Sequence, residues 1–422
     1  MKELAAIILA AGKGTRLVSE KPKVLHLLAG KPLLYYSLKL VWEVGANPCY
    51  VVVGYEADKV KEAFKNESVY WVDQGEQRGT GHALSVTASM LSDFDGDLLV
   101  LYGDTPVLTV NTLRELIKVH QQSPDTTATL LSFRMANPTG YGRIIRDEHN
   151  KVIRIVEEND ATGEEKKITE INAGVYLFNP ASIFNALKKI KPNSRDGEYQ
   201  LTDTILFLAK KGERVQGYCS PDPEACPGIN SREELVAVQR LMQQRIQEDL
   251  LKAGVTIIDP ANTYIETDVV IGPDTTIYPF TVIRTGVKIG RHCEVGPFSH
   301  LRTGTVLEDY AEVGNFTEAK QTKLGRHSKA KHLSYLGDAV IGDDVNIGAG
   351  TITANFDGKN KYQTIIEDGA STGSGTILIA PMKLGKEAVT GAGAVVPKGT
   401  KVPDGTTVVG IPARPLKKKS SR

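Results

Sequence analysis

Aliphatic residues recur at every sixth position between Ile265 and Val313. A helix repeats every 3.6 residues and a strand every two, so neither alone accounts for a sustained period of six. The pattern instead predicts a solenoid in which each six-residue rung contributes one inward side chain, with three rungs to a turn. The positions in register are Ile265, Ile271, Ile277, Ile283, Ile289, Val295, Leu301, Leu307 and Val313.

The period continues towards the C-terminus. Glycine follows four of the repeat positions, and we expect it there because an L-residue would resist the turn; the four are Gly272, Gly290, Gly296 and Gly314. The sequence Asp357-Gly358 predicts a loop that projects from the solenoid between Asn355 and Thr364. Beyond it the repeat resumes at Leu384, Thr390, Val396, Val402 and Val408.

The first 230 residues follow another pattern. Short apolar runs at 5–10, 50–53 and 98–102 are separated by helical stretches such as 33–44. Alternating strands and helices predict a Rossmann-like α/β domain whose mostly parallel sheet is covered on both faces. Its ligand is expected at the loops beyond the strand ends.

A single helix is predicted between these two regions. Ser231 and Glu234 form a capping box, apolar positions follow at helical spacing, and Gly254 supplies a stop. At 1.5 Å per residue, a helix of roughly 22 residues is about 33 Å long. We therefore expect a domain at 1–230, a linker helix at 231–254 and the solenoid domain at 255–422.

Composition excludes several classes of function. Lys and Arg total 51 against 50 for Asp and Glu, which gives no electrostatic case for nucleic acid or an anionic membrane. The four cysteines, Cys226 among them, show no C-x-x-C spacing, and no apolar run is long enough to span a bilayer. We expect a reduced cytoplasmic protein without structural zinc, ending in a solvated basic tail at Lys417 to Lys419.

A glycine-rich loop follows the first apolar run. It reads Leu9-Ala10-Ala11-Gly12-Lys13-Gly14-Thr15-Arg16-Leu17, and Pro22-Lys23 comes soon after. Small residues let backbone N–H groups approach phosphate oxygens, and Lys23 and Arg16 can neutralise them. The loop matches neither a Walker A motif nor the dinucleotide fingerprint. From spacing alone it is either a phosphate cradle or a structural turn.

Further polar residues follow in order along this domain. The segment from Gln74 to Thr80 supplies an amide able to pair with a base edge, beside flat glycines. Asp104 ends an apolar run with a carboxylate, which is either a Mg²⁺ ligand or a helix cap. The remaining pieces are Gly140-Tyr141-Gly142-Arg143, Glu157, Glu170-Ile171-Asn172 and Gly228-Ile229-Asn230.

The loop matches the L-A-A-G-x-G-T-R-L…P-K signature of sugar-1-phosphate nucleotidyltransferases, and the repeat resembles the left-handed parallel β-helix of hexapeptide acyltransferases. Nearly the whole chain resembles the bifunctional N-acetylglucosamine-1-phosphate uridylyltransferase/glucosamine-1-phosphate N-acetyltransferase family. The resemblance implies that Lys23 and Arg16 hold the UTP phosphates and that Asp104 and Asn230 bind Mg²⁺. It places UTP on Leu9, Ala10, Ala11, Gly12, Gln74, Gly79 and Thr80, and N-acetylglucosamine on Tyr102, Gly142, Glu157 and Asn172.

A second polar cluster lies within the solenoid. Acetyl transfer from a thioester to an amine needs a group that removes the amine proton, and a neutral imidazole suits that task. On spacing alone His332 is either that base or a surface residue. The string His-Leu-Ser-Tyr-Leu-Gly-Asp-Ala, which begins at His332, matches the same bifunctional family, and the resemblance makes His332 the general base.

The resemblance also implies the rest of this site. Glucosamine-1-phosphate is expected on Arg302, Lys320, Tyr335 and Asn346, with Asn355 beside the sugar and Glu318 near the imidazole. Acetyl-CoA is expected on Ala349, Asn355, Phe356, Ser374 and Ala392. Phe356 and the ending Ala413-Arg414-Pro415 depart from the usual family pattern at the acetyl-CoA end. Enzymes of this type are homotrimers, so we expect a homotrimer.

The leading hypothesis is an enzyme that acetylates glucosamine-1-phosphate and then uridylylates the product, giving UDP-N-acetylglucosamine, which usually serves bacterial cell-wall synthesis. One alternative is a related nucleotidyltransferase and acetyltransferase with another sugar or base preference, because one methyl or hydroxyl in a pocket can decide specificity. Another is a non-catalytic assembly protein of the same two-domain arrangement. Such a protein has no need of Lys23, Asp104, Asn230, Arg302, Lys320 and His332, which are all present here.

Overall fold

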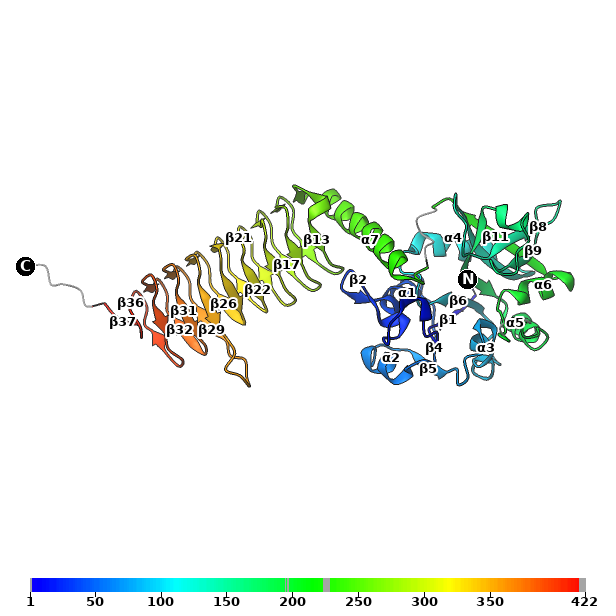
Figure 1. The fold of residues 1–422 in the computed structure, drawn as a ribbon, viewed down its shortest axis with the longest axis horizontal. Helices are drawn as coiled ribbons and strands as arrows, with labels where there is room; N and C mark the ends of the chain where they lie inside the picture. The colour runs from blue at the N-terminus through cyan, green and yellow to red at the C-terminus, as the bar shows by residue number, and fades with distance from the viewer. Residues whose placement is uncertain (1, 194, 196, 223–227, 417–422) are drawn as a thin grey trace, which may run out of the picture. The chain divides into compact units, whose positions relative to one another are not determined.

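A computed structural model describes residues 2–193, 195, 197–222 and 228–416. The chain divides into two compact units, Met1–Gln239 and Arg240–Arg422 (Figure 1). Cys226 and the basic tail at Lys417 to Lys419 lie outside the described residues. Within the described part, no helix is long and apolar enough to cross a membrane.

The first unit is built on a nine-stranded sheet whose main path runs β11-β7-β10-β6-β1-β4-β5. Neighbouring strands from β6 to β5 are parallel, whereas β10 is antiparallel to both β6 and β7. A hairpin of β8 and β9 branches from β10. The strands are β1 (Leu4–Leu9), β4 (Cys49–Val53), β5 (Tyr70–Asp73), β6 (Asp97–Tyr102), β7 (Thr126–Arg134), β8 (Arg143–Arg146), β9 (Val152–Val156), β10 (Glu170–Phe178) and β11 (Arg214–Ser220).

Helices cover both faces of this sheet, as the alternating pattern predicts. Apolar side chains of α1, α2 and α4 form one core with the sheet, and those of α3, α5 and α6 form a second core on the opposite face. β1 is a nearly continuous apolar run because it is buried between these two cores. The helices are α1 (Leu33–Glu43), α2 (Ala57–Ala63), α3 (Thr80–Ser85), α4 (Val110–Gln121), α5 (Pro180–Leu187) and α6 (Asp203–Lys210). A small hairpin of β2 (Leu27–Leu28) and β3 (Lys31–Pro32) precedes α1.

A long helix, α7 (Arg232–Lys252), contains the division between the two units. The predicted capping box is present at its start. The Glu234 N–H donates to Ser231 Oγ at 3.2 Å, and the Ser231 N–H donates to Glu234 Oε2 at 3.2 Å. Gly254 follows the helix with φ of +90°, a left-handed conformation in which glycine ends helices readily.

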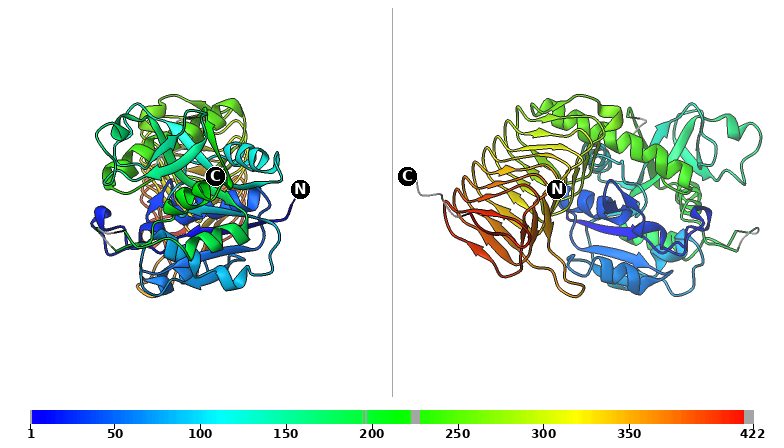
Figure 2. Two further views of the ribbon diagram at one scale, coloured as in Figure 1. Left: turned by 90° about the vertical axis from the view of Figure 1, so that its right-hand side faces the viewer. Right: turned by 60° about the vertical axis from the view of Figure 1, so that its left-hand side comes forward.

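The second unit is a parallel β-helix with three sheets, which we call the first, second and third faces; Figure 2 shows the stacked coils. Each strand pairs with the third strand after it, so three rungs make one coil. The first face holds β12 (Thr256–Ile257), β15 (Thr276–Ile277), β18 (Glu294–Val295), β21 (Glu312–Asn315), β24 (Lys329–His332), β27 (Asn346–Ile347), β30 (Ser371–Thr372), β33 (Val389–Thr390), β36 (Thr407–Val409) and the antiparallel β37 (Arg414–Pro415).

The other two faces have eight strands each. The second face holds β13 (Tyr264–Ile265), β16 (Val282–Ile283), β19 (His300–Leu301), β22 (Glu318–Lys320), β25 (Tyr335–Gly337), β28 (Ile352–Ala354), β31 (Ile377–Ile379) and β34 (Val395–Val396). The third face holds β14 (Val270–Ile271), β17 (Lys288–Ile289), β20 (Val306–Leu307), β23 (Lys323–Leu324), β26 (Ala339–Ile341), β29 (Thr364–Ile366), β32 (Met382–Leu384) and β35 (Lys401–Val402).

Every predicted inward position is buried, and most of them join one apolar core along the coil. Between Ile265 and Val408, the period of the inward positions is broken at the corner between the second and third faces. Two rungs there are one residue short, from Ala319 to Leu324 and from Leu336 to Ile341. The predicted loop is inserted at this same corner, between β28 and β29. The two short rungs and the inserted loop therefore all lie at one corner of the β-helix.

The reason given for the four repeat glycines is wrong at three of them. Only Gly296 has a positive φ, at +103°. At Gly272, Gly290 and Gly314 the next coil lies too close for a side chain. A Cβ on Gly314 would stand 2.1 Å from the Lys331 carbonyl oxygen, for example. The left-handed corner positions hold mostly larger residues, whose side chains point outwards.

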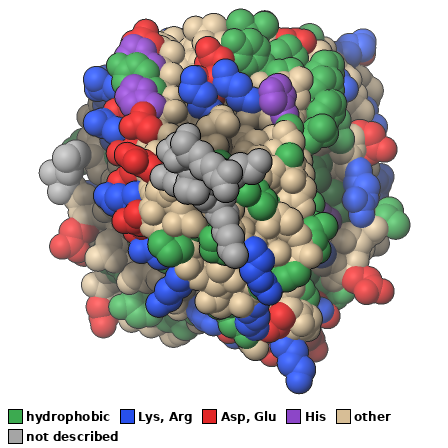
Figure 3. Space-filling model, turned by 90° about the vertical axis from the view of Figure 1, so that its left-hand side faces the viewer, with side chains coloured by type: hydrophobic (Ala, Val, Ile, Leu, Met, Phe, Trp, Pro, Cys, Tyr) green, Lys and Arg blue, Asp and Glu red, His purple; other side chains and the backbone are tan. Residues whose placement is uncertain are grey.

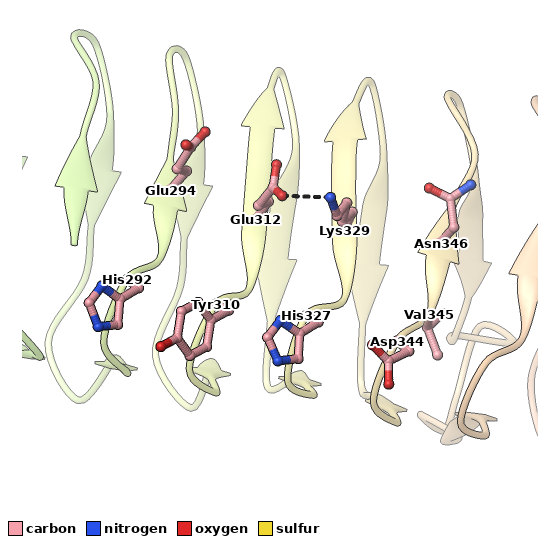
Figure 4. A pocket seen from close by; sticks show the side chains of 9 residues that line it. All are labelled: His292, Glu294, Tyr310, Glu312, His327, Lys329, Asp344, Val345 and Asn346. Carbon is pink, nitrogen blue, oxygen red and sulfur yellow. Dashed lines mark ion pairs between the residues drawn. The ribbon is translucent and has the colours of Figure 1, made fainter. Parts of the chain in front are cut away.

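Two of these corners carry stacked rings. Phe280, Phe298 and Phe316 stack at the corner between the first and second faces, with centroids 4.8 and 5.1 Å apart. At the corner between the third and first faces, His292, Tyr310 and His327 stack at 4.8 Å (Figure 4). A groove of about 490 Å³ runs beside the second stack and reaches Asn346. Charges of both signs are interspersed over the surface drawn in Figure 3.

Candidate active sites

Lys23 joins the two predicted metal ligands of the first unit. Its ammonium group donates to Asn230 Oδ1 at 2.8 Å and forms an ion pair with Asp104 Oδ2. The Ile229 N–H also donates to the Asp104 backbone carbonyl at 3.2 Å, which ties the two segments together. Asp104 follows β6, and Asn230 immediately precedes the helix-capping residue of α7. Two oxygen ligands distant in sequence therefore face one cation.

The glycine-rich loop follows β1 at the carboxyl edge of the parallel strands. Its backbone is fixed by neighbouring strands, since the Leu9 carbonyl accepts from the Gly103 N–H at 3.0 Å and the Ala11 carbonyl from the Tyr55 N–H at 3.1 Å. Gly14 has φ of +71°, and a Cβ there would lie 2.8 Å from the Lys23 Cβ. The absence of a side chain at Gly14 thus leaves room for the Lys23 side chain to lie against the loop. Arg16 lies exposed in the short 3₁₀ helix Thr15–Leu17.

The predicted uracil-binding residues lie together at the end of β5 and the start of α3. The buried Gln74 amide donates to the Gly79 carbonyl at 3.0 Å, which orients the side chain. Gly79 has φ of +94°, and a Cβ there would stand 2.7 Å from the Tyr199 carbonyl oxygen, so only glycine fits. Thr80 Oγ1 accepts from the Leu201 N–H at 3.0 Å.

The four predicted sugar-binding residues also converge. The Asn172 N–H donates to the Gly142 carbonyl at 2.8 Å, and a Cβ on Gly142 would lie 3.3 Å from the Glu157 carboxylate. Glu157 accepts from Thr202 Oγ1 at 3.0 Å. Burial raises the pKa of Glu157, and the nearby carboxylates of Asp160 and Asp203 act in the same direction. Sequence reasoning missed Thr202, because nothing in its local sequence indicates that it contacts Glu157.

These residues fit a Mg²⁺ ion held partly by substrate. No group of three or more His, Cys, Asp or Glu side chains able to hold a metal occurs in the described part of the chain. Asp104 and Asn230 supply two hard oxygen ligands, and Mg²⁺ in nucleotide sites commonly takes its other ligands from phosphates and water. The chain thus offers a site for a metal that arrives with a nucleotide.

In the second unit, the expected phosphate-binding residues share the second face. Arg302 follows β19 and Lys320 ends β22, and their strands are adjacent in the sheet. The Arg302 guanidinium pairs with Glu318 at 2.8 Å, while the Lys320 ammonium lies 3.8 Å from Asp338. The two cations project from neighbouring coils, which suits a phosphate between them.

Lys361 is a further cation that sequence reasoning missed. Its ammonium group lies close enough to that of Lys320 to lower the pKa of Lys320, with burial and Arg302 acting in the same direction and Asp338 opposing them. Lys361 also lines a cavity of about 360 Å³ with Asp338, Tyr362, Gln363, Gly304 and Gln321. Its position depends on the backbone pairing of Lys361 with Phe356 across the base of the inserted loop, and the spacing of the sequence gives no sign of that pairing.

Tyr335 and Asn355 complete this face. Both side chains lie against Gly337. A Cβ on Gly337 would stand 2.6 Å from the Tyr335 hydroxyl oxygen and 2.9 Å from Asn355 Nδ2. Asn355 is buried and donates to Asp338. Phe356, by contrast, is 58% exposed at the start of the inserted loop, where its backbone pairs with Lys361.

His332 and Asn346 belong to the first face. His332 ends β24 and is exposed, and its carbonyl accepts from Ser334 Oγ at 2.9 Å. Asn346 begins β27, the neighbouring strand, where it lines the groove of Figure 4. The structure therefore distributes the expected sugar-binding residues of one chain over two faces of the prism.

A column of small residues begins beside His332. The Gly350 N–H donates to the His332 carbonyl, the Gly375 N–H to the Ala349 carbonyl, and the Gly393 N–H to the Ser374 carbonyl. The expected acetyl-CoA residues Ala349, Ser374 and Ala392 thus lie on successive coils. The left-handed position of this corner holds Phe280, Phe298, Phe316 and Leu333 in earlier coils and Gly350, Gly375 and Gly393 afterwards. The corner changes from bulky to open at the coil that follows His332.

Comparisons with known proteins agree with this two-unit organisation. The nucleotidyl transferase family model matches residues 5–223. A solved structure of UDP-glucose pyrophosphorylase complexed with UDP-glucose has a TM-score of 0.48 and 19% identity; the match covers 58% of this chain and all of that one.

Relatives extend the match across both units. The Bifunctional protein GlmU of Lactococcus lactis is 44% identical, with 96% of this chain and 95% of that protein covered. The protein of the same name from Syntrophomonas wolfei is 41% identical, covering 93% and 95%. That of Syntrophotalea carbinolica is 43% identical, covering 94% and 92%. The chain, with its nucleotidyl transferase unit and its β-helix, belongs to the bifunctional GlmU family.

Proposed function

We propose that this chain makes UDP-N-acetylglucosamine in two steps, acetylating glucosamine-1-phosphate in the β-helix and uridylylating the product in the α/β unit. The observation that carries the proposal is that each unit gathers an independent set of polar residues suited to one step. Lys23, Asp104 and Asn230 meet in the first unit. In the second, the open corner begins at His332.

In the acetyl-transfer step, the amine nitrogen attacks the thioester carbonyl of acetyl-CoA, so that a C–N bond forms and the C–S bond breaks. Arg302, Lys320 and Lys361 bind the sugar phosphate, and the imidazole of His332 accepts the amine proton. The CoA thiolate leaves along the corner of Ala349, Ser374 and Ala392. Backbone N–H groups there supply hydrogen bonds to the developing oxyanion.

In the uridylyl-transfer step, a phosphate oxygen of N-acetylglucosamine-1-phosphate attacks the α-phosphorus of UTP, and pyrophosphate leaves. Catalysis of this kind depends on positioning and on neutralising charge. Lys23 and Arg16 hold the phosphates beside the backbone of residues 9–12, while Gln74, Gly79 and Thr80 hold the base. Tyr102, Gly142, Glu157 and Asn172 hold the sugar. When bound at Asp104 and Asn230, Mg²⁺ screens the repulsion between the two anionic substrates.

The division of the acetyl-transfer residues between two faces supports a homotrimer. Side chains on adjoining faces of a triangular prism point away from each other. Arg302, Lys320 and Tyr335 on the second face and Asn346 on the first therefore cannot all reach one small sugar phosphate from a single chain. A neighbouring copy that places its first face against the second face completes the set. The substrates of both steps are cytoplasmic metabolites, which favours that compartment.

An omission assay tests the proposal. The full chain is incubated with glucosamine-1-phosphate, acetyl-CoA, UTP and Mg²⁺, and the products are identified by mass. We expect UDP-N-acetylglucosamine in the complete mixture, N-acetylglucosamine-1-phosphate without UTP, and no nucleotide sugar without Mg²⁺. Formation of UDP-glucosamine as the main product would contradict the order of steps. Parallel reactions with other sugar phosphates and nucleoside triphosphates test the alternative substrate preference, and a mixture without any product would favour a non-catalytic role.

A further inference from the structure

Lys398 contacts the inserted loop between β28 and β29 at two places. Its ammonium group lies 3.4 Å from Asp357 Oδ2 and 4.1 Å from the centroid of the Tyr362 ring. Asp357 stands near the start of the loop and Tyr362 near its end, so one cation contacts the chain on both sides of the loop's tip. The ring face attracts the ammonium group in addition to its attraction to the carboxylate.

The backbone at Lys398 belongs to a different coil from the base of the loop. Lys398 follows β34, which lies two strands beyond β28 in the second face. The N–H of the next residue, Gly399, donates to the Pro381 carbonyl of the intervening coil at 2.7 Å. Lys398 is therefore held by the stacked coils and provides the loop with an attachment point away from its own base.

The Asp357 carboxylate is oriented for this contact by its own loop. Its Oδ1 atom accepts from the Asn360 N–H at 2.9 Å and from the Lys359 N–H at 3.1 Å. These backbone N–H groups, that of Asn360 foremost, hold the pKa of the Asp357 carboxyl below its usual range. The group is therefore ionised at neutral pH, and its Oδ2 atom is the one that faces Lys398.

The anchored part of the loop adjoins the proposed phosphate subsite. Lys361 directly precedes Tyr362, and both residues line the cavity of about 360 Å³ that Asp338 also lines. The Asp338 carboxylate lies 3.8 Å from the ammonium group of Lys320. The contact between Lys398 and Tyr362 therefore holds the residue next to Lys361 at the wall of this cavity.

We propose that Lys398 is a positioning residue for acetyl transfer, which holds the inserted loop through Asp357 and Tyr362 and so keeps Lys361 at the subsite for the sugar phosphate. The inference rests on the proposed acetyl-transfer function. Lys398 is not one of the six described residues that line the cavity, so it acts through Lys361 and not by touching the substrate. Its side chain is 49% exposed, and its removal should loosen the loop without unfolding the β-helix.

The first measurement is the rate at which trypsin cuts the loop of the full chain. Trypsin cleaves after lysine, and both Lys359 and Lys361 are exposed there. Cleavage at these two sites is followed by mass in wild type, Lys398→Met, Lys398→Arg and Lys401→Met. We expect Lys398→Met to be cut roughly threefold to tenfold faster, the range for one exposed ion pair and one cation–π contact. Lys401→Met removes an exposed lysine of β35 and is the matched control, which should be cut at the wild-type rate.

The second measurement is the steady-state kinetics of acetyl transfer. Lys398→Met should raise the KM for glucosamine-1-phosphate roughly threefold to tenfold, while kcat and the KM for acetyl-CoA stay within about twofold. Lys398→Arg should restore the wild-type KM, because a guanidinium group keeps the charge and also stacks on a tyrosine ring. In a Lys361→Met background, Lys398→Met should have almost no further effect on this KM.

The two measurements separate the ways in which the inference can fail. Wild-type cleavage of Lys398→Met would show that Lys398 does not hold the loop. Faster cleavage with an unchanged KM for the sugar phosphate would show that the loop is held without positioning Lys361, and an undiminished effect in the Lys361→Met background would contradict the proposed route. A wild-type chain that does not acetylate glucosamine-1-phosphate refutes the proposed function instead. The cleavage rates then still decide whether Lys398 holds the loop, and the KM comparison is made with the amino-sugar phosphate that the chain does accept.

Discussion

Lys320 lies beside two other cations, Arg302 and Lys361, and these neighbours affect the pH at which Lys320 loses its proton. Positive neighbours disfavour another positive charge, so the pKa of Lys320 lies below that of an ordinary lysine, Asp338 notwithstanding. Lys320 is therefore charged at low pH and loses its charge as pH rises through the lowered pKa. We expect the KM for glucosamine-1-phosphate to rise in the alkaline range earlier than ordinary lysines would titrate.

Lys361→Met tests this assignment. Removing the neighbouring charge should bring the pKa of Lys320 back towards its ordinary value, so the rise in KM should move to higher pH. At neutral pH the variant should bind the phosphate less well, because one cation is lost. Lys359→Met, which changes another lysine of the same loop, is the control. An identical pH profile in wild type and Lys361→Met would show that the two side chains do not interact in solution.

His332 and Arg302 are expected to affect different kinetic constants. His332→Ala should lower kcat of acetyl transfer by roughly 10² to 10⁴, the usual contribution of a general base. Arg302→Ala should mainly raise the KM for glucosamine-1-phosphate through loss of a charge-assisted contact. Uridylylation serves as the internal control for both variants. A His332→Ala enzyme with full kcat and only a raised KM would make His332 a binding residue.

Some site residues were predictable because their neighbours in sequence carry a motif. The segment that begins at His332 and the loop from Leu9 to Leu17 are continuous strings, so family resemblance identifies them at once. Lys361 and Thr202 have no such string. Each acts through a partner that the fold brings to it, so neither could be assigned before the structure was known.

Among the structural elements, the corner between the first and second faces changes its character along the coil. Its left-handed position passes from Phe316 and Leu333 to Gly350, Gly375 and Gly393. Bulky side chains close this corner in the early coils, and glycine leaves it open beside Ala349, Ser374 and Ala392. We infer that the open part accommodates the long chain of the acetyl donor.

Ala392→Trp should close that corner. The side chain is exposed, so the substitution should have little effect on stability. We expect the KM for acetyl-CoA to rise by tenfold or more, about 1.4 kcal/mol, with the KM for glucosamine-1-phosphate unchanged. Lys401→Trp, on the exposed third face, is the matched control. Equal acetyl-CoA constants in the two variants would place the donor elsewhere.

The period of six predicted the β-helix and its inward residues but not its irregularities. A rung shortened by one residue keeps an apolar residue inside, as at Leu324. The spacing of the apolar positions therefore changes from six to five residues, although the inward positions stay apolar. The repeat glycines were found for the wrong reason, because the close approach of the next coil is a property of the stacked structure. In the α/β unit, the antiparallel pairing of β10 was not predicted, since a strand buried on both faces reads alike in either direction.

On the scale of the whole molecule, we expect the two activities to separate. Each unit has its own apolar core, and the second half of α7 packs on that of the β-helix through Ile246 and Leu250. A fragment of residues 1–253 should therefore keep uridylylation and lose acetyl transfer. Full-length His332→Ala, which retains both units, is the control for the loss of the first step. Loss of uridylylation in a fragment that is folded by circular dichroism would contradict this division.

Stacking the chain in coils gives the β-helix a fixed unit of length. Neighbouring strands are separated by about 4.8 Å, so the three coil-to-coil steps from His332 to Ala392 span about 14 Å. The imidazole and the far end of the open corner can therefore move apart or together only in whole steps, one for each coil gained or lost. We therefore expect the number of coils between His332 and Ala392, rather than any one side chain, to determine the length of acetyl donor that fits along the open corner.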